Sequence, residues 1–451
     1  MLGPKAKKVA IGFGLQFLST RDFCSGFQLV IAMNTRKRTQ MTPPLSMATQ
    51  VRVVSSHSQP VPVTPPSTTS QDQKFHDLGV SAKELRPSVV LTTGQCFHWT
   101  ALSESKDNDS AWGVHNATDW IGILRTRNDS SLVIRLRETP STVLFHALYS
   151  PPDWTTSDIR QHLRDYFQLD VVSVVDLYQS WSKRCDRLRR IAQAIPGLRM
   201  VEQDPFECLV SFLCSSNNNI PRITQMLQRI RKEYGTPLLE FQGETLYSFP
   251  SLSTLREKAT EKDLRGTCRM GYRAKYLIKT MEILHELGDE KYLYSLRENE
   301  NANEVQTALI KFSGVGRKVA DCVALCSLRA VDAVPVDVHV WNIARRDYGM
   351  DEVVSSASLT PKTYGEVATR LRQQFPDYSG WAHALLFAAE LPSFKGRLPV
   401  DMVQEMDQVR EKNPSDVLLL CLKQPFLWRA HLFLRTQFRE AEKQRKRKAS
   451  N

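Results

Sequence analysis

The chain has 451 residues, of which 41% are hydrophobic, so it can bury a sizeable core in two or three domains. Its formal net charge is +12, but residues 1–50 hold seven basic and one acidic residue and residues 435–451 hold seven basic and two acidic, which leaves about +1 between them. The overall charge is therefore weak support for nucleic-acid binding. No stretch is long and apolar enough to span a membrane, so a membrane protein is not expected.

The N-terminal segment is basic. Lys5, Lys7 and Lys8 precede an apolar stretch that has the form of a short secretory signal, and three sequons at positions 108, 116 and 128 would suit a secreted chain. Nine cysteines without paired spacing, however, are typical of reduced intracellular thiols. Since Asp22 is the only acid among residues 1–50, an organelle transit peptide fits this segment better.

Residues 48–72 are rich in Ser, Thr, Pro and Gln and have no apolar period, so they read as a disordered linker. We expect residues 1–74 to be a disordered N-terminal segment. Between 88 and 137 the chain is β-branched or alternating and is interrupted by Gly, Asn and Asp, which predicts an antiparallel sheet domain over residues 75–192. The expected strands are 88–91, 120–124 and 133–137.

From about residue 156 onward, apolar residues recur at helical spacing, and a helical domain is expected over residues 193–392. Residues 393–451 form a C-terminal extension that ends in the basic run Lys443–Lys448. Such a run is usually a solvated tail, but it also has the form of a nuclear import signal. The expected helices are 157–167, 175–195, 205–214, 221–234, 273–287, 303–311, 317–328, 338–346 and 364–375.

The most informative segment of the chain is a glycine turn between two of these helices. Gly314 and Gly316 allow a tight turn with positive φ and leave room for a phosphate beside the backbone N–H groups, including that of Val315. The first N–H groups of the helix that follows have no internal partners and lie at its positive dipole end, so the turn is a candidate anion site. The competing interpretation is a plain connector.

Lys318 lies in the first turn of that helix, where the dipole and partial burial would lower its pKa. An unperturbed lysine is only about 0.04% neutral at pH 7, so a nucleophilic amine needs such a shift. Asp337 follows Pro335 and precedes a helical pattern, so it is a plain N-cap at least. A cap carboxylate near Lys318 would also be able to take a proton or stabilise a cationic sugar.

These two motifs resemble those of the helix-hairpin-helix DNA glycosylases, in particular the eukaryotic 8-oxoguanine DNA glycosylase/AP lyase. The resemblance covers roughly residues 75–390 and implies an α+β fold, with an N-terminal antiparallel β-sheet domain packed on a helical helix-hairpin-helix glycosylase domain. No metal or organic cofactor is implied, and an iron–sulfur cluster is excluded because only Cys421 follows Cys326. The motifs that carry the resemblance are Gly94-Gln95-Cys96-Phe97-His98-Trp99, Gln203-Asp204-Pro205-Phe206-Glu207-Cys208, Cys214-Ser215-Ser216-Asn217-Asn218-Asn219-Ile220, Gly271-Tyr272-Arg273-Ala274-Lys275-Tyr276, Gly314-Val315-Gly316-Arg317-Lys318-Val319-Ala320-Asp321-Cys322 and Val334-Pro335-Val336-Asp337-Val338-His339.

The resemblance also assigns DNA contacts. Asn217 would enter the space left by an extruded base and, with Arg222 and Arg273, hydrogen-bond the orphaned cytosine, while Tyr272 would wedge the stack open. The alternative for the Asn217 segment is a capped turn between two helices. His339 would contact a phosphate, or it is a core histidine.

Further residues are implied for the base pocket. Cys322 would pack against the flipped purine, with Phe387 on its other side, and Gly94 would offer its carbonyl to the N7–H that oxidation gives guanine. Cys326 shares the general face of Lys318 and Cys322, and the alternative for both cysteines is a small core hydrophobe.

Two positions depart from the family pattern. Ser313 stands in the hairpin where the family usually has proline. His383 stands where it usually has glutamine at the pairing edge of the base, and an exposed imidazole would titrate between about pH 5.5 and 7.5. The substitution at His383 therefore bears on base selectivity.

The sequence thus predicts a base-excision repair enzyme, a DNA glycosylase/AP lyase that removes 8-oxoguanine opposite cytosine through a Lys318 Schiff base and β-elimination. The expected partner is double-stranded DNA with oxidised guanine, the expected state is a monomer, and the expected location is the nucleus with the mitochondrion as a second site. Two alternatives stay open: a related glycosylase for another oxidised or alkylated base, and a helix-hairpin-helix module that only binds DNA.

Overall fold

The computed structural model of the protein describes residues 74–102, 119–126, 130–350 and 359–412, all within one compact unit of the chain, residues 64–451. The predicted transit segment, the linker 48–72, the three sequons and the basic run Lys443–Lys448 lie outside the described residues. Within the described ranges, no helix combines the length and the apolar character needed to cross a membrane. The predicted domain boundaries at 192/193 and 392/393 stay predictions.

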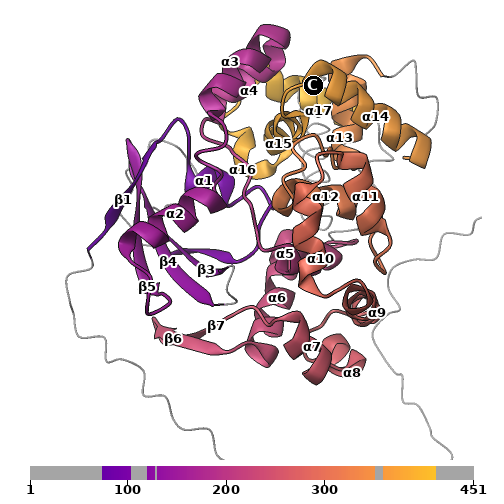
Figure 1. Ribbon diagram of the computed structural model, residues 1–451. Coiled ribbons are helices and arrows are strands. Elements are labelled where there is room, and N and C mark those ends of the chain that lie inside the picture. Colours follow the sequence, from indigo (N-terminus) through magenta and orange to yellow (C-terminus); the bar gives the residue numbers. More distant parts are fainter. Residues whose placement is uncertain (1–73, 103–118, 127–129, 351–358, 413–451) are drawn as a thin grey trace, which may run out of the picture. The chain divides into compact units, whose positions relative to one another are not determined.

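The N-terminal part holds a five-stranded antiparallel sheet with the strand order β1-β5-β4-β3-β2 (Figure 1). The strands predicted over 120–124 and 133–137 are confirmed as β3 and β4, which pair in register from Asp119 opposite Arg137 to Arg125 opposite Ser131. The strands are β1 (His76–Ser81), β2 (Trp99–Leu102), β3 (Asp119–Arg125), β4 (Ser131–Glu138) and β5 (Thr142–Tyr149), and a separate hairpin is formed by β6 (Pro237–Phe241) and β7 (Glu244–Tyr247).

The strand predicted over residues 88–91 is wrong, because this segment is the short helix α1 (Pro87–Val90). Pro87 occupies the first helical position, where its fixed φ suits a helix, and Arg86 before it is extended, as the residue before a proline prefers. A carboxylate oxygen of Glu138 accepts a hydrogen bond from the Ser88 N–H at 2.7 Å and so satisfies the helix start. These contacts outweigh the β-propensity of the valines.

Eight of the nine predicted helices are confirmed to within three residues of their predicted bounds. The helices at Leu252–Lys258, Glu261–Gly266, Glu290–Ser295, Ser379–Glu390, Pro392–Lys395 and Val400–Lys412 were not predicted. The helix predicted over 175–195 is two helices, because Cys185 is extended (φ −148°, ψ 110°) and ends one helix while its sulfur caps the next. The helices are α2 (Thr156–Tyr166), α3 (Val174–Arg184), α4 (Asp186–Ala194), α5 (Pro205–Leu213), α6 (Ile220–Tyr234), α7 (Leu252–Lys258), α8 (Glu261–Gly266), α9 (Arg273–Glu286), α10 (Glu290–Ser295), α11 (Ala302–Ile310), α12 (Arg317–Ser327), α13 (Val338–Tyr348), α14 (Pro361–Gln374), α15 (Ser379–Glu390), α16 (Pro392–Lys395) and α17 (Val400–Lys412), with a 3-10 turn at Leu296–Glu298.

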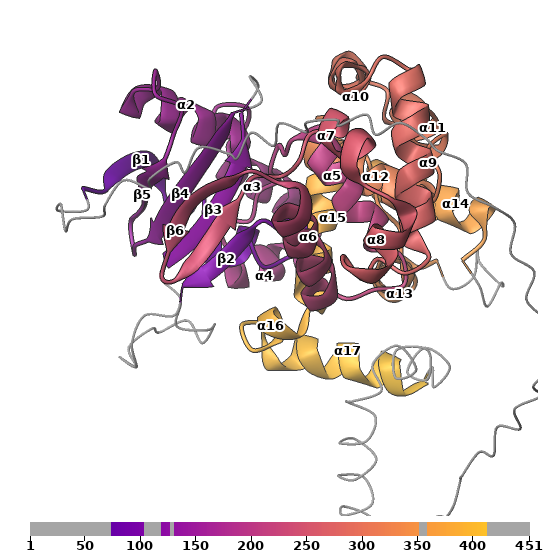
Figure 2. The ribbon, with the colours of Figure 1, turned by 90° about the horizontal axis from the view of Figure 1, so that it is seen from below.

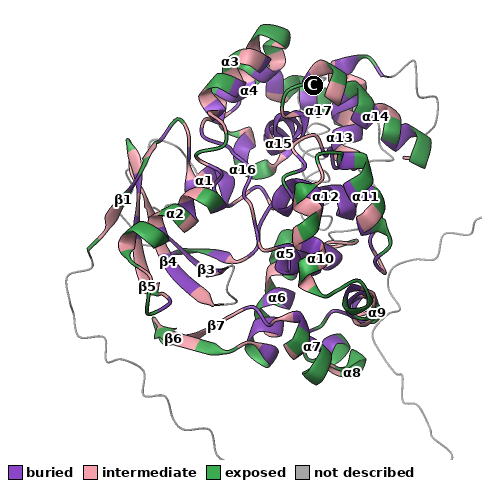
Figure 3. Ribbon diagram, in the orientation of Figure 1, coloured by how far each residue is buried: buried purple, intermediate pink, exposed green. Residues whose placement is uncertain are grey.

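One continuous hydrophobic core joins one face of the sheet to the helices. All nine residues of α5 are buried, and this helix packs against α12, so the centre of the helical part lies between them (Figure 3). On the other face of the sheet, Ile121 and Val133 form a small second cluster that Leu239 and Phe241 of β6 cover. Figure 2 shows the β6–β7 hairpin lying across the sheet.

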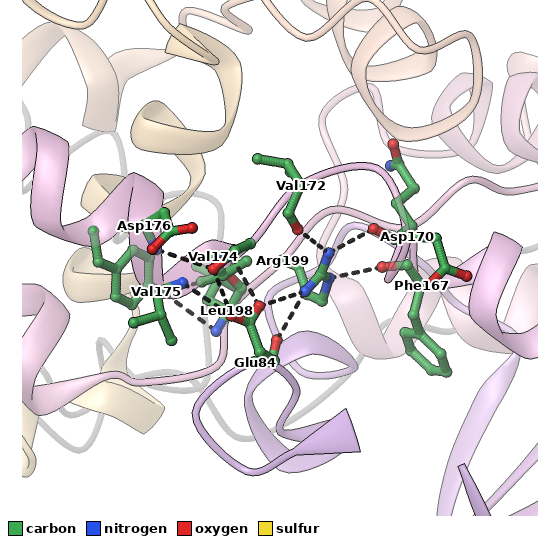
Figure 4. A network of polar contacts seen from close by, with 12 residues as sticks. Glu84, Phe167, Asp170, Val172, Val174, Val175, Asp176, Leu198 and Arg199 are labelled. Carbon is green, nitrogen blue, oxygen red and sulfur yellow. Dashed lines mark hydrogen bonds and ion pairs between the residues drawn. The ribbon is translucent and has the colours of Figure 1, made fainter. Parts of the chain in front are cut away.

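A buried arginine holds the sheet part to the helical part (Figure 4). Arg199, whose side chain is 1% exposed, donates to the carbonyl oxygens of Phe167 and Val172 at 2.8 Å each and to the Glu84 carboxylate at 2.9 Å. The same carboxylate accepts from the N–H of Val174 at 2.8 Å, at the start of α3. Because planar guanidinium donors meet fixed acceptors from three segments, the segments cannot shift independently.

We therefore expect Arg199→Met to lower the free energy of unfolding by about 3 kcal/mol, since it leaves the Glu84 carboxylate without its charged partner and the Phe167 and Val172 carbonyl groups without this donor. The matched control is Arg189→Met, which breaks an exposed pair with Asp186 and should change stability by less than about 0.5 kcal/mol. Urea titrations of the three proteins measure this difference. Equal losses in the two variants would show that the buried arginine has no special weight.

Candidate active site

The hairpin between α11 and α12 rests on α9. Gly314 has φ +78°, and a Cβ there would lie 2.6 Å from the ring of Tyr276, so glycine is required both by conformation and by space. The Thr280 hydroxyl donates to the Ser313 carbonyl at 3.1 Å, which ties the turn to the same helix. The turn therefore keeps its place although Ser313 replaces proline.

The prediction for Gly316 needs a correction. Its φ is −88°, not positive, and it serves as the N-cap of α12 with open space where a Cβ would be. The Val315 N–H is bonded to the Phe312 carbonyl at 3.2 Å, so this amide is not free for a phosphate. No side chain caps α12, however, and the N–H groups of its first turn lack partners within the helix. The N–H groups that are open to an anion are therefore those of Arg317 and Lys318 rather than that of Val315.

The two predicted catalytic groups face each other. The Lys318 Nζ lies 3.9 Å from Oδ2 of Asp337. The other carboxylate oxygen, Oδ1, accepts from the N–H groups of His339 at 3.0 Å and Val340 at 3.1 Å, which confirms Asp337 as the N-cap of α13. One carboxylate thus has one oxygen fixed by the helix and one turned toward the amine.

The predicted lowering of the Lys318 pKa is wrong for this state of the protein. The Cys322 sulfur contributes most to raising the pKa of Lys318, and the Asp337 carboxylate adds to it, while burial opposes both. Because burial raises the pKa of the Cys322 thiol to about 11, the thiol is neutral at pH 7, and the carboxylate is the charge that acts on the amine there. The lysine side chain is also 41% exposed, so the resting amine is protonated.

Beside this pair lies a cavity of about 410 Å³, within the range of small-molecule sites. The structure brings all five predicted base-pocket residues to its wall together with the catalytic pair and His339. Gly94 has φ +79°, which favours glycine, and a Cβ there would approach Ile220 to 3.0 Å. The lining residues from the prediction are Gly94, Lys318, Cys322, Cys326, Asp337, His339, His383 and Phe387.

His383 is 6% exposed, and both of its ring nitrogens lack a hydrogen-bond partner among the described residues. Its ring is nearly parallel to that of Phe387, with an interplanar angle of 19°. Burial lowers the pKa of His383 to about 4, so the prediction that it titrates between pH 5.5 and 7.5 is wrong. A neutral imidazole offers one donor and one acceptor to a base in the cavity. His339 is only partly buried and meets Phe387 edge to face, so it is not a core histidine.

Four of the predicted DNA contacts do not line the cavity, whereas His339 does; the four are Asn217, Arg222, Tyr272 and Arg273. Asn217 is exposed and has a left-handed backbone, with φ +48°. The Tyr272 hydroxyl donates to the Ser216 carbonyl at 3.1 Å, and the buried Arg273 guanidinium donates to the Ser216 and Asn217 carbonyls. In this structure, Arg273 therefore holds the loop that presents Asn217. Arg222 is exposed at the start of α6, where its N–H is capped by Asn219.

Several cavity residues were not predicted. Phe212, Ile220 and Leu391 also line the cavity, and Ile220 is among the exposed large hydrophobic residues. An apolar residue directly after the Asn217–Asn219 run was the available signal for Ile220. The sequence held no such signal for Phe212 and Leu391, because both belong to apolar runs that are typical of a hydrophobic core. The helix α15, which carries His383 and Phe387, was also missed.

Comparison with known proteins agrees with this geometry. Residues 77–209 match the family model of the 8-oxoguanine DNA glycosylase N-terminal domain. Residues 210–374 match that of the HhH-GPD superfamily base excision DNA repair proteins. The two matches meet within α5 and together span the sheet, the loop with Asn217 and the catalytic pair.

Two curated relatives extend over most of the chain. An N-glycosylase/DNA lyase OGG1 of Arabidopsis thaliana is 34% identical over 79% of this chain and 95% of its own length. An N-glycosylase/DNA lyase of Saccharomyces cerevisiae is 30% identical over 75% of this chain and 92% of its own length.

The fold agrees with a solved structure of Clostridium acetobutylicum 8-oxoguanine glycosylase/lyase, bound to double-stranded DNA with cytosine opposite 8-oxoG. The TM-score is 0.55 and the identity 27%, over 70% of this chain and 96% of that one. Because these relatives are N-glycosylase/DNA lyases, the similarity favours an enzyme over a helix-hairpin-helix module that only binds DNA. The chain belongs to the 8-oxoguanine DNA glycosylase family of eukaryotic N-glycosylase/DNA lyases, and it is a DNA glycosylase with DNA lyase activity.

Proposed function

We propose that this enzyme removes 8-oxoguanine paired with cytosine in duplex DNA, and that the Lys318 amine is the nucleophile. The observation that carries the proposal is the placement of Lys318 and Asp337, 3.9 Å apart, on the wall of a cavity of about 410 Å³, which is large enough for a base. The bacterial relative of known structure was solved with the same lesion and the same opposite base. A duplex cannot offer its sugar to a lysine in such a wall unless the base is flipped out.

The chemistry follows from the two groups. The resting amine is an ammonium, so it must lose a proton before it attacks C1′, and Oδ2 of the Asp337 carboxylate, 3.9 Å away, is placed to accept it. Attack forms the C1′–N bond as the base leaves with the glycosidic electron pair and takes up a proton. Opening of the sugar ring gives a Schiff base, and loss of a C2′ proton then expels the 3′ phosphate by β-elimination. The Asp337 carboxylate also stabilises positive charge that develops on the sugar.

Recognition of the lesion is proposed for the residues on the cavity wall. The Gly94 carbonyl would accept from the N7–H of 8-oxoguanine, whereas normal guanine presents a lone pair there and is rejected. His383 would use its donor and its acceptor at the pairing edge, with the base stacked between Phe387 and Cys322. Asn217, Arg222 and Tyr272 would fill the gap in the duplex and bind the orphaned cytosine, and His339 would contact a phosphate at the cavity mouth.

We further propose that the protein acts as a monomer in the nucleus and that a second pool enters the mitochondrion. The support is the basic run Lys443–Lys448 and the basic, acid-poor segment 1–50.

Lys318→Gln should abolish both base excision and the covalent enzyme–DNA adduct that borohydride traps, because no other lysine of the described residues lines the cavity. Single-turnover assays on an 8-oxoguanine:cytosine duplex measure the first, and gel shift under denaturing conditions the second. Lys311→Gln, at the end of the neighbouring helix α11, is the control and should trap like the wild type. Trapping that survives Lys318→Gln would refute the assignment.

Asp337→Asn keeps an oxygen to cap α13 but removes the charge beside Lys318. We expect the single-turnover excision rate to fall by at least ~10²-fold while the Kd for lesion duplex changes by less than ~3-fold. The same measurements on Asp204→Asn, another N-cap aspartate that lies at the start of α5, should show no comparable separation of rate from binding. Equal losses in rate and binding for Asp337→Asn would leave this carboxylate a cap only.

The buried His383 should stay neutral throughout the pH range in which the protein is assayed, because its pKa is about 4. The ratio of excision rates on 8-oxoguanine and guanine should therefore not change between about pH 5.5 and 7.5 through this residue. His383→Gln should shift the ratio by the same factor at every pH in that range. A pH-dependent ratio that the substitution flattens would show that the imidazole titrates on the DNA complex.

A further inference from the structure

A buried tyrosine lies behind the catalytic pair, on an element that contributes nothing to the cavity wall. Tyr364 is in α14, and its hydroxyl donates to Oδ2 of Asp321 at 2.5 Å and accepts from the Val336 N–H at 3.2 Å. The Val334 carbonyl oxygen lies 3.3 Å from the same hydroxyl. The hydroxyl is thus bonded at once to α12 and to the segment directly before Asp337.

Both partners of Tyr364 belong to elements that carry catalytic groups. Asp321 is 0% exposed and lies one turn after Lys318 on α12, and its other oxygen, Oδ1, accepts from the Gln306 amide of α11 at 2.7 Å. Val336 immediately precedes Asp337, and Pro335 before it lines the cavity. The Asp321–Tyr364 contact is therefore the link between the helix that presents the amine and the segment that presents the carboxylate.

The charge state of Asp321 supports this function. Burial raises the pKa of Asp321 to about 6, against the opposing effects of its bonds to Tyr364 and Gln306 and of the Arg372 and Arg317 charges. At neutral pH the group is ionised, so each of its oxygens can accept one of the two donors. Because this buried carboxylate is ionised, it attracts its two neutral donors and holds them in place.

We propose that Tyr364 and Asp321 are positioning residues for base excision, which fix the separation between the Lys318 amine and the Asp337 carboxylate. This proposal rests on the proposed function of that pair. A proton transfer and an attack on C1′ both require the two groups at a defined distance, and a displacement of about 1 Å can cost ~10²-fold in rate. Neither residue lines the cavity, so their loss should affect the chemical step rather than binding.

The test is single-turnover excision and binding by Tyr364→Phe. We expect the excision rate to fall by ~10- to 100-fold, with the Kd for lesion duplex within ~2-fold of the wild type. Tyr178→Phe is the matched control, because its hydroxyl also has three hydrogen-bond partners, which are backbone groups of Ile195 and Leu198, but lies on α3 away from the cavity. It should lose similar stability in urea and keep the wild-type rate. Equal rates for the two variants would overturn the proposal.

A second measurement separates positioning from general stability. In the Asp337→Asn background, Tyr364→Phe should slow excision by less than ~3-fold, because the carboxylate through which it acts is gone. A full additional loss there would contradict the proposal. Should Tyr364→Phe not fold, Asp321→Asn replaces it, since its amide keeps an acceptor for Gln306 but turns a donor toward Tyr364, and the same pattern is expected.

The outcomes also distinguish this proposal from the proposed function. Absence of a borohydride adduct with the wild-type enzyme would refute the nucleophilic role of Lys318 itself. An adduct that forms with the wild type at a normal rate, and forms equally fast with Tyr364→Phe, would leave Lys318 in place and refute only the positioning role.

Discussion

The proposed active site depends on the different contacts that the two oxygens of the Asp337 carboxylate make. One oxygen is held by two N–H groups at the start of α13, so the side chain cannot rotate freely. The other oxygen is left 3.9 Å from the Lys318 amine. Because the cap fixes the first oxygen, it also fixes the direction in which the second oxygen points. The hairpin positions the Lys318 amine in a similar way, because the contact of Gly314 with Tyr276 fixes the place at which α12 begins.

The free enzyme is in a resting state rather than an activated one. The pKa of Lys318 is raised, so the amine is charged when no substrate is bound. Bound DNA would exclude water from the partly exposed lysine and would change the field around it through its phosphates. In the proposed mechanism the amine is then activated only in the complex with DNA, and the carboxylate that helps to raise the pKa of the amine is also the group placed to accept its proton. Such an arrangement limits reaction with other electrophiles, because a protonated amine is not a nucleophile.

Much of the fold could be predicted from the sequence, because helices have local start signals. Asp204, Asn219, Asp337 and Thr360 all cap helices, and the helices at three of them were expected to begin within two residues of the observed start. The predictions failed where contacts between distant parts of the chain determine the local structure. Residues 88–91 form a helix because Pro87 and Glu138 act on them, and Cys185 breaks a continuous helical pattern.

The membership of the site was also largely predictable, whereas its electrostatics were not. Every residue expected in the base pocket lines one cavity, since short motifs carry the identity of such residues. The pKa of Lys318 and that of His383 were both misjudged, because each depends on neighbours that are distant in sequence or on burial that no local pattern reveals. The link through Tyr364 and Asp321 was invisible for the same reason, since 43 positions separate its two residues.

The central claim is that the Lys318 amine forms the bond to the sugar. The most direct measurement is peptide mapping by mass spectrometry, after the enzyme has been reduced with borohydride on an 8-oxoguanine:cytosine duplex and digested with nuclease and protease. We expect a single modified peptide that carries the sugar remnant on Lys318. A remnant on any other amine, or an unmodified Lys318 in an enzyme that has excised the base, would contradict it.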